Sequence, residues 1–149
     1  MASALDVASF ILKEYGKMTT WKLQKLVYYC QAWSLVWDEK PLFFEPIEAW
    51  ANGPVVRSLF NAHRGKFSVS RIPGGDPDKL NSDEVETIKN VVDYYGKQSS
   101  QYLSDLTHME DPWLSTRIRG GILNDRRSNK EISLESMAEY YGSLEPDED

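Results

Sequence analysis

The chain has few of the residues that build metal centres and disulfides. Its 149 residues include one cysteine, Cys30, and two histidines, His63 and His108. A single cysteine excludes an intramolecular disulfide, and these three side chains do not form a zinc-binding spacing. The sequence therefore predicts neither a disulfide-stabilised fold nor a structural metal site.

Long apolar runs and phosphate-binding loops are also missing. No run approaches the roughly 20 apolar residues that span a bilayer, and the N-terminus lacks the basic, apolar and small-residue regions of a signal peptide. No Walker-type loop or G-x-G-x-x-G motif occurs, and Gly74 with Gly75 is too short a signal. We therefore expect a cytoplasmic protein without a membrane segment, a metal or another cofactor.

Positive charge is scarce in the second half of the chain. The net charge is -6; residues 1–75 hold nine Lys and Arg against six Asp and Glu, and residues 76–149 hold eight against seventeen. Residues 145–149 form an acidic tail that we expect to be disordered. An acidic chain binds nucleic acid poorly by default, so nucleic acid is disfavoured as a partner.

One cluster of cations runs against this trend. Two interpretations are open: a solvated loop, or a docking surface for an acidic partner, of which nucleic acid is one form. The cluster comprises Arg117, Arg119, Arg126, Arg127 and Lys130.

Apolar and aromatic residues are plentiful enough for a packed core. The chain is 41% hydrophobic and carries five Trp, eight Tyr and five Phe. At this length, a chain of this composition is expected to form one domain, here residues 1–144. The aromatic residues that the core does not use would suit a contact surface.

The segment at residues 20–37 predicts a helix with almost no solvated side. At 100° per residue, Leu23, Leu26, Val27, Cys30, Trp33 and Trp37 share one face, and Trp21, Tyr28, Ala32 and Leu35 share the opposite one. Such a helix is usually buried in the middle of a domain. Two narrow polar flanks remain, Gln24 with Gln31, and Lys22 with Lys25 and Tyr29, and the second of these is expected to face water.

Capping residues and apolar stripes predict the other helices. Expected caps or starts are Ser3 or Asp6, Thr19 or Thr20, Pro54 for a helix at 54–63, Ser82, Ser99 or Ser100, Asp111 followed by Pro112, and Ser133. Gly16 is expected to end the first helix. Residues 43–50 and 67–72 alternate and predict either a small two-stranded β element or ordered loops. The expected fold is therefore mainly α, with six or seven helices around the helix at residues 20–37.

Few residues suggest catalysis. Cys30 lies on the apolar stripe, where a buried, inert thiol is the default, although a hydrolase pairing it with His63 or His108 stays open. His108 stands at a junction between two helices. It is either a hydrogen-bonded corner residue or, with Trp113, a polar and aromatic patch for a partner.

Three separated motifs resemble the Panacea domain family, which includes SocA-like antitoxins and phage-associated GepA-like proteins. They are Lys22-Leu23-Gln24-Lys25-Leu26 with Tyr28-Tyr29 and Gln31-Ala32-Trp33, then Glu48-Ala49-Trp50 with Gly53-Pro54-Val55-Val56, and finally Leu106-Thr107-His108 with Glu110-Asp111-Pro112-Trp113. They follow in the family's order, and the resemblance covers about residues 4–141.

The resemblance implies a binding protein rather than an enzyme. Panacea domains are antitoxins, typically encoded beside a small toxin that they neutralise, and their toxins are unrelated to one another, alarmone synthetase-like ones among them. SocA-like members instead deliver the toxin to the ClpXP protease. Both modes are open for this chain.

We expect the family motifs either to border the toxin or only to specify the fold. A rigid platform with ordered aromatic and charged anchors would suit toxin binding. The candidate contact residues are Lys22, Lys25, Tyr29, Trp50, Gly53, Pro54, Val55, His108, Glu110, Asp111 and Trp113.

Overall fold

The computed structural model describes residues 1–122 and 126–144, and within them it is mainly α-helical. The predicted acidic tail at 145–149 lies outside the described residues. The helices are α1 (Ala4–Tyr15), α2 (Thr20–Trp37), α3 (Arg57–His63), α4 (Ser82–Tyr95), α5 (Ser100–Met109), α6 (Asp111–Arg119) and α7 (Leu134–Gly142), with a short 3-10 helix at Pro77–Lys79. The predicted mainly α class with six or seven helices is confirmed.

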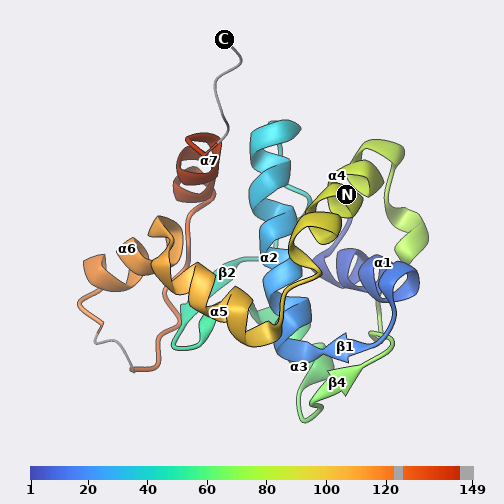
Figure 1. Ribbon diagram of the computed structural model, residues 1–149, viewed down its shortest axis with the longest axis horizontal. Coiled ribbons are helices and arrows are strands. Elements are labelled where there is room, and N and C mark those ends of the chain that lie inside the picture. The colour runs from blue at the N-terminus through green and yellow to red at the C-terminus, as the bar shows by residue number, and fades with distance from the viewer. Residues whose placement is uncertain (123–125, 145–149) are drawn as a thin grey trace.

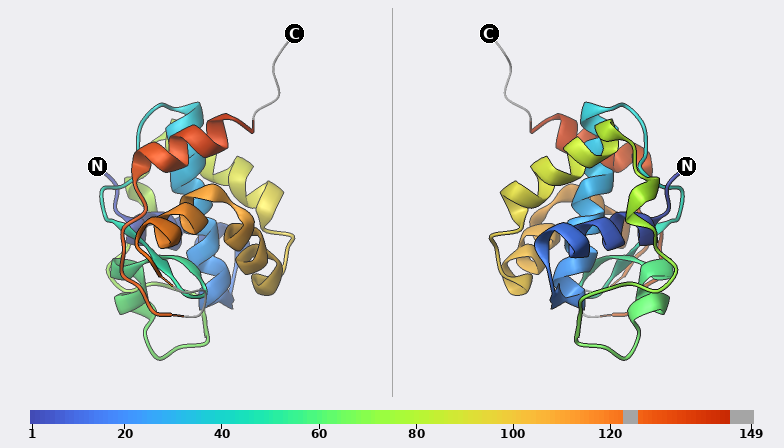
Figure 2. Two further views of the ribbon diagram at one scale, coloured as in Figure 1. Left: turned by 90° about the vertical axis from the view of Figure 1, so that its left-hand side faces the viewer. Right: turned by 90° about the vertical axis from the view of Figure 1, so that its right-hand side faces the viewer.

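Helix α2 runs through the centre of the domain (Figure 1). It packs against α1, α4, α5 and α7 and against strand β3 (Gly53–Val56). Both apolar faces are covered: Leu26 and Cys30 on one face and Tyr28 and Ala32 on the other are buried. The two side views show the same arrangement, with the other helices placed around α2 (Figure 2). The prediction of a central helix at residues 20–37 is confirmed.

Side-chain caps begin most of the helices where the sequence places them. Ser3 forms a capping box with Asp6, and Thr19 accepts a hydrogen bond from the backbone of Lys22. Two expected caps are wrong. Asn81, not Ser82, caps α4, and Asp111 is the first residue of α6 rather than its cap.

Strand pairing differs from the prediction. Strand β2 (Ile47–Trp50) pairs antiparallel with β3, which is formed by residues expected to begin a helix, so α3 starts only at Arg57. Strand β4 (Ser68–Val69) pairs instead with β1 (Met18–Thr19). The local reason is the two-residue turn between Trp50 and Gly53, which brings neighbouring segments together before a distant strand can compete.

The proline of β3 fits this hairpin without a lost bond. Pro54 is the partner of Ala49, and the Ala49 N–H donates to the carbonyl of Lys130 on the other edge of β2, at 2.8 Å. Ile132 likewise donates to Ile47, at 2.8 Å. Strand β2 therefore lies between β3 and the segment at 130–132, and Pro54 occupies a position that needs no donor.

The polar flanks of α2 are buried apart from the half-buried Lys22, which corrects the expectation that Lys25 and Tyr29 face water. The Gln24 side chain accepts from Val56 N at 2.9 Å and donates to Val56 O at 3.2 Å. The Gln31 side chain bonds the backbone of another extended segment in the same way. It accepts from Leu42 N at 2.7 Å and donates to Phe43 O at 2.8 Å. Each glutamine thus satisfies the backbone of an extended segment that covers the helix.

Candidate functional site

The tip of the β2–β3 hairpin joins three segments that are far apart in the sequence. Ser104 on α5 donates to Asn52 O at 2.8 Å, and the indole N–H of Trp113 on α6 donates to Trp50 O at 2.7 Å. On the other side, the Lys25 ammonium of α2 donates to Pro54 O at 3.3 Å. All three family-like motifs therefore meet at this hairpin.

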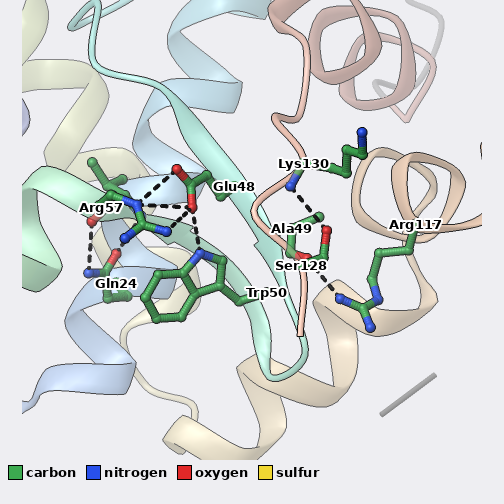
Figure 3. A network of polar contacts seen from close by, with 9 residues as sticks. Gln24, Glu48, Ala49, Trp50, Arg57, Arg117, Ser128 and Lys130 are labelled. Atoms are coloured by element: carbon green, nitrogen blue, oxygen red, sulfur yellow. Dashed lines mark hydrogen bonds and ion pairs between the residues drawn. The ribbon is translucent and has the colours of Figure 1, made fainter. Parts of the chain in front are cut away.

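Trp113 is held between a histidine and an arginine. The His108 ring stacks on Trp113 with 4.1 Å between ring centroids, and the Arg117 guanidinium lies 5.1 Å from the Trp113 ring. Arg117 also donates to Ala49 O at 2.8 Å (Figure 3). Arg117 is buried. It therefore belongs to the interior and not to the expected solvated loop or docking surface.

Lys25 is a buried lysine without a carboxylate partner among the described residues. Its side chain is 1% exposed and its ammonium makes one hydrogen bond, the long contact to Pro54, while the Trp21 ring lies 5.2 Å away. Burial alone lowers the pKa of Lys25 to about 7. The expectation of a solvated Lys25 is therefore wrong, because the hairpin and α5 cover this flank of α2.

His108 lies near Lys25, and its pKa is also lowered. Burial and the nearby charge of Lys25 lower its pKa, while Asp105 and the Asn52 backbone act in the opposite direction. Its Nε2 atom is buried and has no hydrogen-bond partner within residues 1–122 and 126–144. The corner histidine expected from sequence is thus stacked but only partly hydrogen-bonded.

A pocket opens beside Lys25, between α2, the hairpin tip and α5. Its volume is about 310 Å³. We call it the lysine pocket. It is lined by Trp21, Lys25, Asn52, Ser100, Gln101, Ser104 and His108.

A larger hollow of about 770 Å³ adjoins the lysine pocket, with Trp21 and Asn52 lining both. We call it the arginine groove. Its charged and aromatic lining residues are Trp21, Trp50, Phe60, Arg57, Arg64 and Arg127. Neither hollow has an aspartate or glutamate among its described lining residues.

One arginine of the groove is already paired. Arg57 forms a bidentate contact with Glu48, with N–O distances from 2.9 to 3.2 Å, and the Trp50 indole donates to the same carboxylate (Figure 3). Burial would raise the pKa of Glu48, but the hydrogen bonds from Arg57 and Trp50 outweigh it and lower that pKa. Arg64, by contrast, lies 6.0 Å from the Phe60 ring and is exposed.

Four expected contact residues lie elsewhere. Lys22 donates to Gly96 O at 2.6 Å at the end of α4, and Asp111 is exposed on α6. Tyr29 and Glu110 are buried between helices. The structure thus brings Lys25, Trp50, Gly53, Pro54, His108 and Trp113 together, with Val55 buried in the strand beneath them.

Glu110 connects four helices. Standing between α5 and α6, it accepts from the hydroxyl of Tyr29 on α2 at 2.7 Å and from that of Tyr141 on α7 at 2.8 Å. Tyr141 also shares a hydrogen bond with Tyr28, at 3.0 Å. Burial raises the pKa of Glu110, against the two tyrosine bonds. This residue is therefore structural, which its place beside Asp111 in the sequence did not reveal.

The residues proposed for a hydrolase are not arranged for catalysis. Cys30 is fully buried in the core, and burial raises the pKa of its thiol, which disfavours the nucleophilic thiolate. His63 is buried and its Nε2 lies 3.0 Å from the Gln24 amide nitrogen. In the part of the chain that the structure describes, no group of three or more His, Cys, Asp or Glu could hold a metal ion.

Comparison with known families decides the identity. A family model described as antitoxin SocA-like, Panacea domain, matches residues 23–114, which is more than half of the chain. The chain belongs to this family. No curated protein and no solved structure gives a match.

The Panacea match includes the whole hairpin region. It begins at Leu23 on α2 and ends at Leu114 on α6, so Lys25, Asn52 and His108 all lie inside it. A family of antitoxins implies a toxin as partner in general. Among the described helices, none is long and apolar enough to cross a membrane.

Sequence reasoning missed several residues of the two hollows. Asn52, Ser104 and Phe60 were not singled out because each is unremarkable in its own segment, and Trp21 was assigned only to an apolar face of α2. Lys25 did carry a usable signal. Its helical neighbours three and four positions away are Lys22, Tyr28, Trp21 and Tyr29, so α2 offers it no acidic partner.

Gly53→Ala is expected to lower the free energy of unfolding by about 2 kcal/mol. Gly53 has φ +123°, and an added Cβ would lie 2.6 Å from Lys25 Cε and 3.1 Å from Thr107 Oγ1. The change therefore combines backbone strain with displacement of the lysine. Urea denaturation measures it.

Gly65→Ala is the matched control. Gly65 also has positive φ, +84°, but an added Cβ would meet nothing within 4 Å. A smaller loss is expected there. Equal losses at the two glycines would show that the contact with Lys25 has no energetic weight.

Proposed function

We propose that this chain is the antitoxin of a prokaryotic or prophage toxin–antitoxin pair and neutralises a small cognate toxin by direct binding in the cytoplasm. The observation that carries the proposal is the match to the SocA-like antitoxin family over residues 23–114. The toxin could belong to any of several classes of growth inhibitor, alarmone synthetase-like enzymes among them.

The hairpin region supports binding as the mode of action. Two adjoining hollows lined by tryptophans and arginines give an ordered surface with the residue types that dominate protein interfaces. The hairpin is fixed from three sides by Ser104, Trp113 and Lys25, so little side-chain entropy is lost on binding.

Co-expression tests the proposal. Each small open reading frame that flanks the gene is expressed in a bacterial host with and without this chain. We expect one of them to stop growth alone, to allow growth in the presence of the chain, and to co-purify with it. If no flanking product is toxic or is rescued, the proposal fails.

Deleting the protease from the host separates the two modes. A direct neutraliser protects in a strain without ClpX or ClpP, because it blocks the toxin by occupancy. A SocA-like adaptor protects only when ClpXP is present, and the toxin level then falls in step. Rescue that disappears in the deletion strain would assign this chain to the adaptor mode.

A further inference from the structure

The Lys25 ammonium is buried with fewer hydrogen-bond acceptors among the described residues than it has N–H groups. A buried ammonium is normally paired, because removing an isolated charge from water is costly. Its three N–H groups find one acceptor among the described residues, Pro54 O at 3.3 Å. Its side chain is 1% exposed and lies in the wall of the lysine pocket.

Resting on the proposed function, we propose that the lysine pocket receives an aspartate or glutamate side chain of the toxin, and that the acidic segment carrying it continues along the arginine groove. The inserted carboxylate would accept hydrogen bonds from the free N–H groups of Lys25. It would supply the counter-charge that the described residues do not provide.

The pocket has the size and the polar groups for this occupant. Its volume of about 310 Å³ exceeds the roughly 30 Å³ of a water molecule about tenfold, which leaves room for a carboxylate side chain. The lining includes the hydroxyl-bearing Ser100 and Ser104 and the amides of Asn52 and Gln101. The Ser100 hydroxyl and the Asn52 amide can donate to a second carboxylate oxygen, whereas the Ser104 hydroxyl already donates to Asn52 O and the Gln101 amide to Asp105.

Charge complementarity selects an acidic segment of a protein. The chain as a whole is acidic, with a net charge of -6. Yet the described lining of the two hollows contains no carboxylate. It contains Lys25, Arg64 and Arg127, together with Arg57, which is paired with Glu48. The groove also presents Trp50 and Phe60, whose rings can pack against neighbouring apolar side chains of a polypeptide. A small anion would use the pocket but not these rings.

Insertion of a carboxylate beside Lys25 is expected to make toxin binding depend on pH. The pKa of Lys25 is about 7 in the free protein and would rise beside a carboxylate. Complex formation therefore takes up a proton above pH 7 and weakens as pH rises. The other charged groups near the pocket are His108 and Asp105 on α5 and Arg117 on α6. Of these, His108 has a lowered pKa and is mainly neutral across pH 7–9.

The test measures the affinity of the purified chain for the toxin identified by co-expression. Lys25→Met retains the length and apolar body of the side chain without the charge, and is expected to weaken binding at pH 7 at least tenfold. Wild-type affinity is expected to fall roughly tenfold or more between pH 7 and pH 9, and that of Lys25→Met to change little. Lys89→Met, at an exposed lysine on α4, is the matched control and should bind as wild type.

Alanine substitution of each Asp and Glu of the toxin identifies the inserted residue. One such variant should lose affinity for the wild-type chain and none for Lys25→Met, so that the two changes are not additive. Circular dichroism confirms that each variant is folded.

Three results would overturn the inference. One is equal binding by Lys25→Met and Lys89→Met, which leaves the antitoxin function standing. Another is the absence of a coupled acidic residue on the toxin. The third is a titration without toxin in which micromolar acetate or phosphate shifts the Lys25 NMR signal to a plateau. This result would make the pocket a small-anion site. Failure of the wild-type chain to neutralise any flanking product would instead reject the proposed function.

Discussion

Replacing Glu110 by alanine is expected to lower the free energy of unfolding by about 3 kcal/mol, because two buried tyrosine hydroxyls lose their acceptor. Tyr29 and Tyr141 both donate to the same Glu110 oxygen, at 2.7 and 2.8 Å. Both rings are fully buried, so water cannot replace the carboxylate without opening the core. Chemical denaturation monitored by tryptophan fluorescence measures the loss.

Glu110→Gln is the matched control, since its amide oxygen can accept both hydroxyls. Its free energy of unfolding is expected to stay within about 1 kcal/mol of the wild-type value at neutral pH. Folding raises the pKa of Glu110. At pH values between the carboxyl pKa of the unfolded chain and that of the folded protein, the unfolded chain therefore binds fewer protons than the folded one. Wild-type stability therefore declines as pH rises through the folded pKa, and the Gln variant lacks this decline. Equal losses in the Ala and Gln variants would show that the hydrogen bonds have little weight.

Replacing Lys25 by methionine is expected to stabilise the folded protein at neutral and acidic pH. Burial lowers the pKa of Lys25 from 10.5 to about 7, and a shift of this size corresponds to an energy on the order of 5 kcal/mol. Methionine fills the same volume without a charge to desolvate. The gain is measured as the difference in free energy of unfolding between variant and wild type.

The pH dependence gives this prediction a sign. Between pH 7 and pH 10.5 the unfolded wild-type chain binds more protons than the folded one. Wild-type stability therefore rises with pH across this window, and the penalty is fully present below pH 7. The advantage of Lys25→Met should shrink steadily from pH 7 to pH 9. An advantage that is independent of pH would show that Lys25 is not desolvated in the folded state.

The two Lys25 predictions together describe a residue that costs stability and contributes to binding. A variant that is more stable but binds toxin less well is the combination expected of a functional group rather than a packing group. A variant that is less stable and binds normally would assign Lys25 to the fold alone.

The helices were predictable because their signals are local. Ser3, Thr19, Ser99 and Ser133 cap helices where the sequence places them. Gly16 ends the first helix, and two-sided apolarity marked α2 as central. At α4 the neighbours Asn81 and Ser82 are equally good capping types, so the sequence did not choose between them. At α6 the N-cap position is held by Glu110, which makes no side-chain cap, although Asp111 is the better capping type.

Strand pairing and solvent exposure could not be predicted from local sequence signals. Residues 67–72 alternate well enough to pair with β2, but the turn between Trp50 and Gly53 offers a nearer partner. Polar residues on α2 were expected to face water because lysine and tyrosine carry polar groups. Their burial depends on what the hairpin, α5 and α7 cover, and this information lies outside the helix.

The sequence by itself determined the α-helical class, the central position of α2 and the membership suggested by three separated motifs, because periodicity, caps and motif order are written along the chain. Only the tertiary structure decided that Lys25 is buried with no carboxylate partner in the described part of the chain, that Glu110 joins four helices, and that Trp21 and Asn52 line both a pocket and a groove. The physical reason is that burial and pairing are properties of segments brought together by folding. Residues 25, 52 and 108 become neighbours only when the hairpin packs between α2 and α5.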